Sequence, residues 1–255
     1  IRGIRMKKIS IVLGFLFLSL TVVADDHAPN ILGLETYACN FNEGNDLQDV
    51  LAAAKKWNNF ASKNFSMPYQ AYVLTPFYRN AQDQQHDFYW LGLSPSFEAQ
   101  GTVQDEMRNK GQKFQAAFDA VSNCDGQSQW AMLRIKTSDE EPSAEGAVSF
   151  EACTMLEGYT QEKMMVADEK MNAFMNKAGV SGNVVRWFPI SGQSSASNVD
   201  FYQVTGSSSL TERGKNFDRA VKSGGLQMRN ALYGDLVACS GRGTSLYVDV
   251  GGKES

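Results

Sequence analysis

The chain has 255 residues, and its 28 acidic residues outnumber its 24 lysines and arginines, which gives a formal net charge of −4. This balance disfavours binding to phosphate backbones, so we expect no nucleic-acid partner. The length is sufficient for one large domain or for two of roughly 100 residues, each with its own hydrophobic core.

Residues 1–24 have the features of a secretory signal peptide, with residues 1–5 upstream of it. Met6-Lys7-Lys8 is a short basic start, and an uninterrupted apolar run covers residues 9–23. Small residues at its end predict cleavage after Ala24. The run is too short for a stable membrane span, and no second long apolar run follows. We therefore expect a secreted or periplasmic protein, exported by a bacterial-type signal and not in the membrane after cleavage.

Three pairs of segments recur in the same order along the chain. The pairs are 38–44 (ACNFNEG) with 152–158 (ACTMLEG), 76–89 with 189–202, and 118–126 with 233–241. Their offsets are 114, 113 and 115 residues. A shared order of this kind predicts a tandem duplication. We expect a first repeat at 25–136, an acidic linker with Pro and Gly at 137–147, and a second repeat at 148–255.

Within the first copy the hydrophobic periodicity changes in a clear order. Residues 31–41 read as a strand, and Asn45 or Asp46 then caps a helix with apolar positions spaced by three or four residues. Two strands follow at 69–78 and 86–94. A second helical region ends in 114–123, and a last strand covers 129–136.

The second copy repeats this order. A helix begins near Thr160 and Gly179 is its natural C-cap. Two strands follow at 183–190 and 199–206, then a helical region ending in 228–237 and a last strand at 244–251. The glycine-rich segment 240–245 lacks the lysine of a phosphate-binding loop, and we interpret it as the turn into the last strand.

The order β-α-β-β-α-β is that of the ferredoxin-like unit, in which the first and last strands are antiparallel neighbours. Cys39 and Cys124 lie on these strands in the first copy, and Cys153 and Cys239 in the second. We therefore predict two disulfides, Cys39–Cys124 and Cys153–Cys239. Their separations, 85 and 86 residues, are nearly equal, as a duplicated bridge requires. The alternative is four buried free thiols.

Two such units in one chain resemble the dimeric α+β barrel superfamily, in which two ferredoxin-like halves pair their sheets. The resemblance implies an α+β fold of two tandem ferredoxin-like repeats that form an intrachain pseudo-dimeric α+β barrel, so that the halves pair within the chain. It rests on element order and duplication, and it carries over no catalytic residue, so the catalytic residues stay unknown.

Few residues point to catalysis or to a metal. The only histidines are His27, near the expected mature start, and His86, in the first copy, which we interpret as a solvated strand-edge residue. Motifs for zinc, nucleophilic serine, nucleotide and nicotinamide binding are absent, so we predict no metal and no cofactor. Duplication also yields two pairs of carboxylates, Glu43 with Glu157 and Asp87 with Asp200. Either they converge at a site or they serve turns and strand ends.

Aromatic residues crowd the second and third strands of both copies. One interpretation is core and half–half interface; the other is a cavity between sheet and helices that holds an apolar or aromatic small molecule. The candidate pocket residues are Tyr72, Tyr89, Trp90, Trp187 and Tyr202. A methionine-rich helix in the second copy, with Met164, Met165, Met171 and Met175, suits an adaptable wall.

These observations favour an exported, disulfide-bonded, non-catalytic protein that binds a small ligand or has a structural role. The alternative is a cofactor-independent or haem-linked monooxygenase-like enzyme, suggested by the fold resemblance alone. A third hypothesis is an assembly component whose exposed sheet edges recruit partners.

Overall fold

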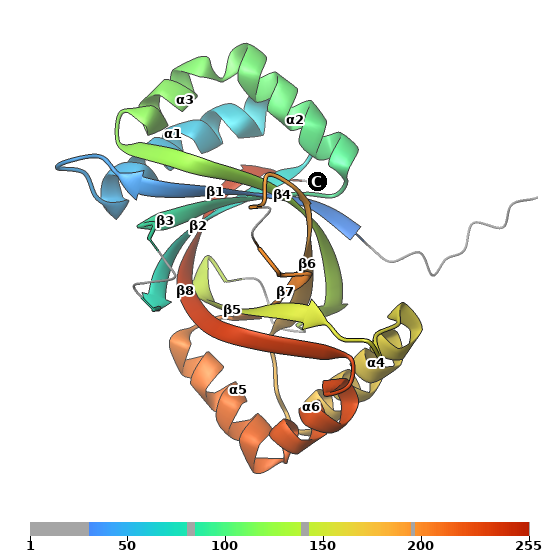
Figure 1. Ribbon diagram of the computed structural model, residues 1–255. Coiled ribbons are helices and arrows are strands. Elements are labelled where there is room, and N and C mark those ends of the chain that lie inside the picture. The colour runs from blue at the N-terminus through green and yellow to red at the C-terminus, as the bar shows by residue number, and fades with distance from the viewer. Residues whose placement is uncertain (1–30, 81–84, 139–142, 195–196, 255) are drawn as a thin grey trace, which may run out of the picture.

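The computed structural model describes residues 31–80, 85–138, 143–194 and 197–254. It shows a closed antiparallel β-barrel with two groups of helices on opposite sides of it (Figure 1). One group, α1 to α3, comes from the first half of the chain, and the other, α4 to α6, from the second half. We use "first half" for residues 31–136 and "second half" for residues 145–253.

The first half has four strands and three helices. They are β1 (Ile31–Phe41), α1 (Leu47–Asn64), β2 (Tyr69–Tyr78), β3 (Phe88–Ser94), α2 (Phe97–Lys110), α3 (Gln112–Asp119) and β4 (Ser122–Lys136). Asp46 caps α1, because its carboxylate accepts the backbone N–H of Gln48 at 2.7 Å. Ser96 caps α2 in the same way. The last strand begins seven residues earlier than the periodicity predicts.

The second half repeats the arrangement. Its elements are β5 (Glu145–Met155), α4 (Gln161–Lys177), β6 (Asn183–Ser191), β7 (Phe201–Ser207), α5 (Leu210–Lys222), α6 (Gly225–Tyr233) and β8 (Val237–Lys253). Thr160 is the N-cap of α4, as expected, and Ser209 caps α5 at the position equivalent to Ser96. Gly179 follows α4 with a φ of +68°, the left-handed conformation that glycine adopts most readily.

The strand order around the barrel is β1-β3-β2-β8-β5-β7-β6-β4, and every pair is antiparallel. Each half contributes the order 4-1-3-2 of a ferredoxin-like unit, and the halves meet through the pairs β2–β8 and β4–β6. The predicted pseudo-dimeric α+β barrel is therefore confirmed. Closure gives each of the eight described strands two partners, so the hypothesis of exposed sheet edges that recruit partners is wrong.

Both predicted disulfides are present. Cys39 and Cys124 lie opposite each other on β1 and β4, with their Cα atoms 3.9 Å apart, and Cys153 and Cys239 do so on β5 and β8 at 4.0 Å. Among the described residues no cysteine is free. Each bridge fixes the first strand of its half to the last.

The glycine-rich segment 240–245 is not the turn that the sequence suggested. It lies inside β8, which continues on both sides of it. Between Phe150 and Ala152 the pairing with β5 shifts, because two residues of β8, Gly241 and Arg242, face one residue of β5. Gly241 has a φ of +65°, which accommodates the extra residue of a β-bulge.

The two faces of the barrel wall have separate cores. Leu34, Leu74 and Leu91 pack inside the barrel, together with Tyr72. Val73, the residue between Tyr72 and Leu74, packs on the other face with α1. The alternation predicted for this strand is thus observed.

The expected signal peptide, residues 1–24, lies outside the described residues. No helix in the described part of the chain is long and apolar enough to cross a membrane. β4 ends at Lys136, just before the expected linker 137–147, and β5 begins at Glu145, so residues 145–147 of that linker belong to the strand.

Candidate functional site

Each half encloses a cavity between its helices and the outer face of the sheet. The first-half cavity has a volume of about 770 Å³, and the second-half cavity about 310 Å³. The halves align by register, because Cys39 pairs with Phe88 on β3 as Cys153 pairs with Phe201 on β7. Side chains of the two cavities can therefore be compared position by position.

The five aromatic residues predicted to line one pocket lie on two faces of the sheet. Tyr72 and Trp187 line a cavity of about 310 Å³ inside the barrel, and Tyr89 and Tyr202 pack in the same interior. Trp90 lines the first-half cavity on the other face. Tyr89 and Trp90 are consecutive on β3, so their side chains point to opposite sides. The structure brings four of the five together and separates Trp90 from them.

The barrel interior is an aromatic core around a small cavity. Trp130 packs edge-on against Tyr202 with ring centroids 5.5 Å apart and lies 6.4 Å from Trp187. The pKa of Tyr72 is raised to about 12, mainly by burial and to a smaller extent by the nearby Asp249 carboxylate. This hydroxyl therefore keeps its proton at neutral pH. The buried indole N–H of Trp187 has no hydrogen-bond partner among the described residues.

Apolar side chains from all three helices form the walls of the second-half cavity. Met164, Met171 and Met175 of α4 line it, as expected. Met165 does not line it and is 55% exposed. Phe217 of α5 and Leu226 of α6 also line the cavity, yet they are 51% and 57% exposed, so they stand at its rim. The wall is thus apolar, flexible and open at one side.

Cationic side chains outnumber carboxylates around this second-half cavity. The cationic lining residues are Lys136, Arg186, Arg213, Arg229 and Arg242. The one carboxylate among the described lining residues is that of Glu151. It accepts hydrogen bonds from Arg229 at 3.1 Å and from Arg242 at 2.7 Å. Glu151 alone cannot balance these charges.

Arg213 has a different environment. Its Nε donates to the Ser149 hydroxyl at 2.8 Å, and its guanidinium lies over the Tyr78 ring, 5.6 Å from the centroid. Ser149 is itself buried and shares a hydrogen bond of 2.9 Å with Thr244. None of the described carboxylates forms an ion pair with Arg213, which lines the cavity.

Arg186, by contrast, is fully engaged. Its two terminal nitrogens donate to both oxygens of Asp168, at 2.7 and 2.6 Å, and its Nε donates to Gln203 at 2.9 Å. The Tyr233 hydroxyl donates to Asp168 at 2.8 Å. The pKa of Tyr233 is raised well above its usual value, mainly by burial and to a smaller extent by the Asp168 charge. The guanidinium also lies over the Phe201 ring at 5.4 Å. This cluster anchors α4 and α6 to the sheet.

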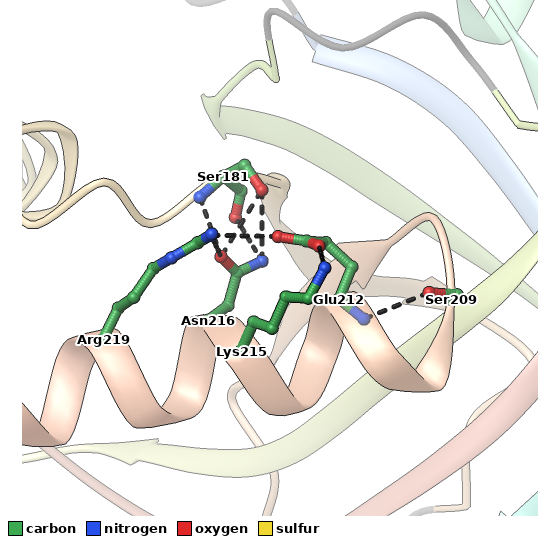
Figure 2. A network of polar contacts seen from close by, with 6 residues as sticks. All are labelled: Ser181, Ser209, Glu212, Lys215, Asn216 and Arg219. Carbon is green, nitrogen blue, oxygen red and sulfur yellow. Dashed lines mark hydrogen bonds and ion pairs between the residues drawn. The ribbon is translucent and has the colours of Figure 1, made fainter.

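A second polar cluster includes two residues that line the cavity, Ser181 and Asn216 (Figure 2). Asn216, buried on α5, accepts the backbone N–H of Ser181 at 3.0 Å and donates to its carbonyl at 3.1 Å. Arg219 donates to Asn216 and to Glu212, and Lys215 pairs with Glu212. Because Ser181 lies between α4 and β6, this clasp holds the α4–β6 connection against α5.

The first-half cavity contains a buried carboxylate. Glu35 is 4% exposed, and its Oε1 accepts hydrogen bonds from the Tyr69 hydroxyl and from Gln104 Nε2, both at 2.6 Å. Among the described residues its Oε2 accepts one hydrogen bond, from the Tyr37 hydroxyl at 3.5 Å. Trp90 Nε1 donates to the Tyr69 oxygen at 3.2 Å. Oε2 therefore keeps acceptor capacity.

The other charges around this cavity are also negative. Among the described residues no lysine or arginine lines it, whereas Asp119 and Asp125 do. Asp125 contacts His86 Nε2 at 2.8 Å, and Asp119 accepts from Gln115 at 2.8 Å. Burial raises the pKa of Glu35, although its three hydrogen bonds oppose the shift. The pKa values of Tyr69 and Tyr37 are raised mainly by burial and to a smaller extent by the Glu35 charge.

The two cavities have diverged at equivalent positions. By register, Ser149 replaces Glu35 and Glu151 replaces Tyr37 in the second half. Arg213 lies four residues after the N-cap Ser209, where the first half has Gln100 four residues after Ser96. The two halves therefore share a frame, while the charged side chains that line their cavities are mostly positive in the second half and negative in the first.

The other predicted candidates have structural positions. The Asp87 and Asp200 carboxylates accept the backbone N–H groups of Phe41 and Met155, at 3.0 and 2.6 Å, and so tie the ends of β1 and β5 to the loops before β3 and β7. Glu43 and Glu157 are exposed and line neither of the two cavities. His86 precedes β3 and is also outside both.

Haem, which the fold resemblance suggests, does not fit the donors of the second-half cavity. The usual axial ligands are His, Cys thiolate and Tyr, with Met as a partner of His. In the second-half cavity the described residues offer no histidine, its cysteine is disulfide-bonded, and Tyr233 donates to Asp168. His27 lies outside the described residues. Within the described part of the chain no cluster of His, Cys, Asp and Glu is suited to a metal ion.

Sequence reasoning missed Glu35 and Arg186, although a signal was present. Both are charged residues within apolar strands, at positions that face the helices: Glu35 follows Leu34, and Arg186 precedes Trp187, and both apolar neighbours point into the barrel. A charge on a helix-covered face is costly unless it has a role or a partner.

No protein-family model and no curated protein sequence matches the chain. Solved structures do. A proposed monooxygenase from Fusobacterium nucleatum has a TM-score of 0.53 at 10% identity, covering 90% of this chain and 96% of the other. A mutant chlorite dismutase from Candidatus Nitrospira defluvii has a TM-score of 0.52 at 8% identity, covering 88% and 93%. An anthrone oxidase-like protein has a TM-score of 0.50 at 11% identity, covering 88% and 91%. At these identities the likeness shows a shared fold.

Proposed function

We propose that this chain is an exported small-molecule-binding protein, and that its second-half cavity holds an organic anion with an apolar body. The two disulfides support export, since such bonds persist in oxidising compartments. So does the leader-like sequence of residues 1–24. Intact mass of protein recovered from its host checks this part: we expect a mature chain that starts at Asp25.

The observation that carries the ligand class is the charge around the cavity. Five cationic side chains line it, against Glu151 and the Arg186-bound Asp168, in a chain whose formal net charge is −4. Positive charge gathered in one cavity of an acidic protein favours an anionic group there. Arg213 is the first candidate to bind that group, because no described carboxylate pairs with it.

The walls define the rest of the ligand. Met171, Met175 and Phe217 offer apolar contact beyond the charged groups, and Val221 and Leu226 extend this surface to the exposed rim. Flexible methionine side chains adapt to different shapes. A carboxylate or sulfonate on an aromatic or aliphatic body satisfies both parts of the cavity.

A matched pair of fluorescent probes tests the proposal. We expect 8-anilinonaphthalene-1-sulfonate to bind more tightly than N-phenyl-1-naphthylamine, which has the same rings without the sulfonate. Arg213→Gln combined with Arg242→Gln is expected to weaken sulfonate binding by about tenfold or more and leave the neutral probe unchanged. The control is Lys222→Gln, which removes one exposed charge from α5 outside the cavity. Equal sulfonate binding by the double variant and the native protein would overturn the proposal.

A monooxygenase-like enzyme is the second candidate function, and the fold shared with the proposed monooxygenase and the anthrone oxidase-like protein favours it. Because the donors present do not fit haem, the cofactor-independent form is the one we retain. The purified protein incubated with haemin is expected to give no Soret band characteristic of a ligated haem. Native mass spectrometry of protein from its own host would identify a co-purified ligand.

A further inference from the structure

The first-half cavity differs enough from the proposed anion site to have a ligand of its own. We propose that it is a second binding site, selective for an organic ammonium ion with an aromatic or apolar body, and that Glu35 is the residue that binds the cation. This inference goes beyond the anion site and does not depend on it.

Among the described residues, Glu35 has no cationic partner. Glu35 is buried, and buried carboxylates are normally paired with a cation. No lysine or arginine of the described chain lines its cavity. Its described partners, Tyr69, Gln104 and Tyr37, are neutral donors, and Oε2 accepts only the hydrogen bond of 3.5 Å from Tyr37 among them. A bound ammonium group supplies the charge that the protein omits.

The wall of the cavity is aromatic. Trp57 and Trp90 meet edge to face with ring centroids 4.9 Å apart, and Phe118 lies 5.2 Å from Trp90. With Tyr69 they form an aromatic wall around the cavity. Aromatic faces attract cations and accommodate the apolar body of a ligand.

The exposed charged residues that line the cavity are acidic. Asp119 and Asp125 line the cavity and are exposed, so the path to Glu35 passes carboxylates. His86 partly neutralises Asp125 when protonated. This negative lining attracts cations and repels the organic anions proposed for the other half. The two halves of the chain thus select ligands of opposite charge.

Two naphthalene probes of equal size test this by calorimetry near neutral pH. We expect 1-naphthylmethylamine, a cation, to bind about tenfold or more tightly than 1-naphthalenemethanol, its neutral analogue. Glu35→Gln retains an oxygen that can accept from Tyr69 and Gln104, so it is expected to fold. It should remove the tenfold preference and leave the alcohol unchanged. The control is Asp105→Asn, which removes one charge from α2 outside the cavity.

The pH dependence gives an independent readout. The groups that face Glu35 are Tyr37 from β1 and Tyr69 from β2, with Asp125 from β4, its partner His86, and Asp119 from α3 at the entrance. From α1, α2 and β3 the cavity receives Trp57, Gln104, Met107 and Trp90, which do not titrate. Amine binding is expected to strengthen from acid to neutral pH as Glu35 loses its proton. In Glu35→Gln, which retains every other titrating group, most of this dependence should disappear.

Three results would overturn the inference: equal binding of amine and alcohol, amine binding that survives Glu35→Gln, or no amine binding at millimolar concentration. Arg213→Gln with Arg242→Gln serves as a cross-check. This double variant is expected to leave amine binding intact, so the two proposed sites are tested independently of each other.

Discussion

The Arg186 guanidinium and the Asp168 carboxylate form a two-point ion pair at 2.7 and 2.6 Å, buried under α4 with the Tyr233 hydroxyl as a third partner. Both side chains are almost fully removed from water, with exposures of 3% and 8%. A pair of this kind is costly to break from one side, because the remaining charge is then buried without a partner.

We therefore expect Asp168→Asn to lower the free energy of unfolding by about 3–5 kcal/mol, measured by urea denaturation at neutral pH. The control is Glu212→Gln, which removes a carboxylate that pairs with Lys215 and Arg219 at the surface of α5 and is expected to change stability little. A loss below about 1 kcal/mol for Asp168→Asn would show that the pair is dispensable.

The Cys39–Cys124 bridge closes a loop of 85 residues. In the chain-entropy account, a closure of this length stabilises the folded state by up to about 4–5 kcal/mol. Cys39→Ala with Cys124→Ala should lower the melting temperature of the oxidised protein. Under reductant, where the native protein also lacks the bridge, the two should melt within a few degrees of each other. Identical melting in the oxidised state would contradict a stabilising role.

Glu35 makes stability depend on pH in a defined direction. Burial raises its pKa above the ordinary value of 4.5, so the folded chain holds this proton more tightly than the unfolded chain does. Its stabilising contribution is complete below the unfolded pKa and is lost as pH rises through the folded one. Relative to Glu35→Gln, the native protein is expected to lose stability as the pH rises above 4.5 and through the raised folded pKa of Glu35. Urea denaturation of both proteins across this range measures the difference, and a constant difference would refute it.

Gly92 on β3 has the Tyr69 ring directly over it. A Cβ at this position would meet the Tyr69 hydroxyl oxygen at 1.8 Å and a ring carbon at 2.3 Å. Gly92→Ala must displace Tyr69, and with it the hydrogen bond to Glu35, so we expect a loss of about 1–3 kcal/mol by thermal or urea unfolding. Gly101→Ala on α2, where nothing lies within 4 Å, is the matched control and should stabilise by about 0.5–1 kcal/mol. Equal effects of the two substitutions would contradict the tight packing.

The sequence was informative where the physics is local or repeated. Alternation placed Tyr72 and Leu74 on one face, side-chain caps set the start of the helix after Thr160, and the register of the duplicated cysteines followed from the order of elements. Each of these depends on neighbours along the chain or on the comparison of two copies.

The site was harder to predict because it depends on contacts between distant segments. Glu35 meets Gln104 across 69 positions of sequence, and Arg186 meets Tyr233 through Asp168. Trp90 was grouped with Tyr89 by proximity in sequence, although consecutive strand residues face opposite sides. The segment 240–245 was misjudged because glycine signals a bulge inside a long strand as readily as a turn.

The seams β2–β8 and β4–β6, which join the halves into one barrel, have a consequence for how the molecule can vary. In a barrel assembled from two identical polypeptides, any substitution in one chamber appears in its twin. Here each cavity is built from its own part of the sequence. Glu35 and Ser149 can therefore differ, while Cys39 and Cys153 keep the same scaffold. Because both halves belong to one chain, the residues of the two cavities can diverge while the barrel stays the same.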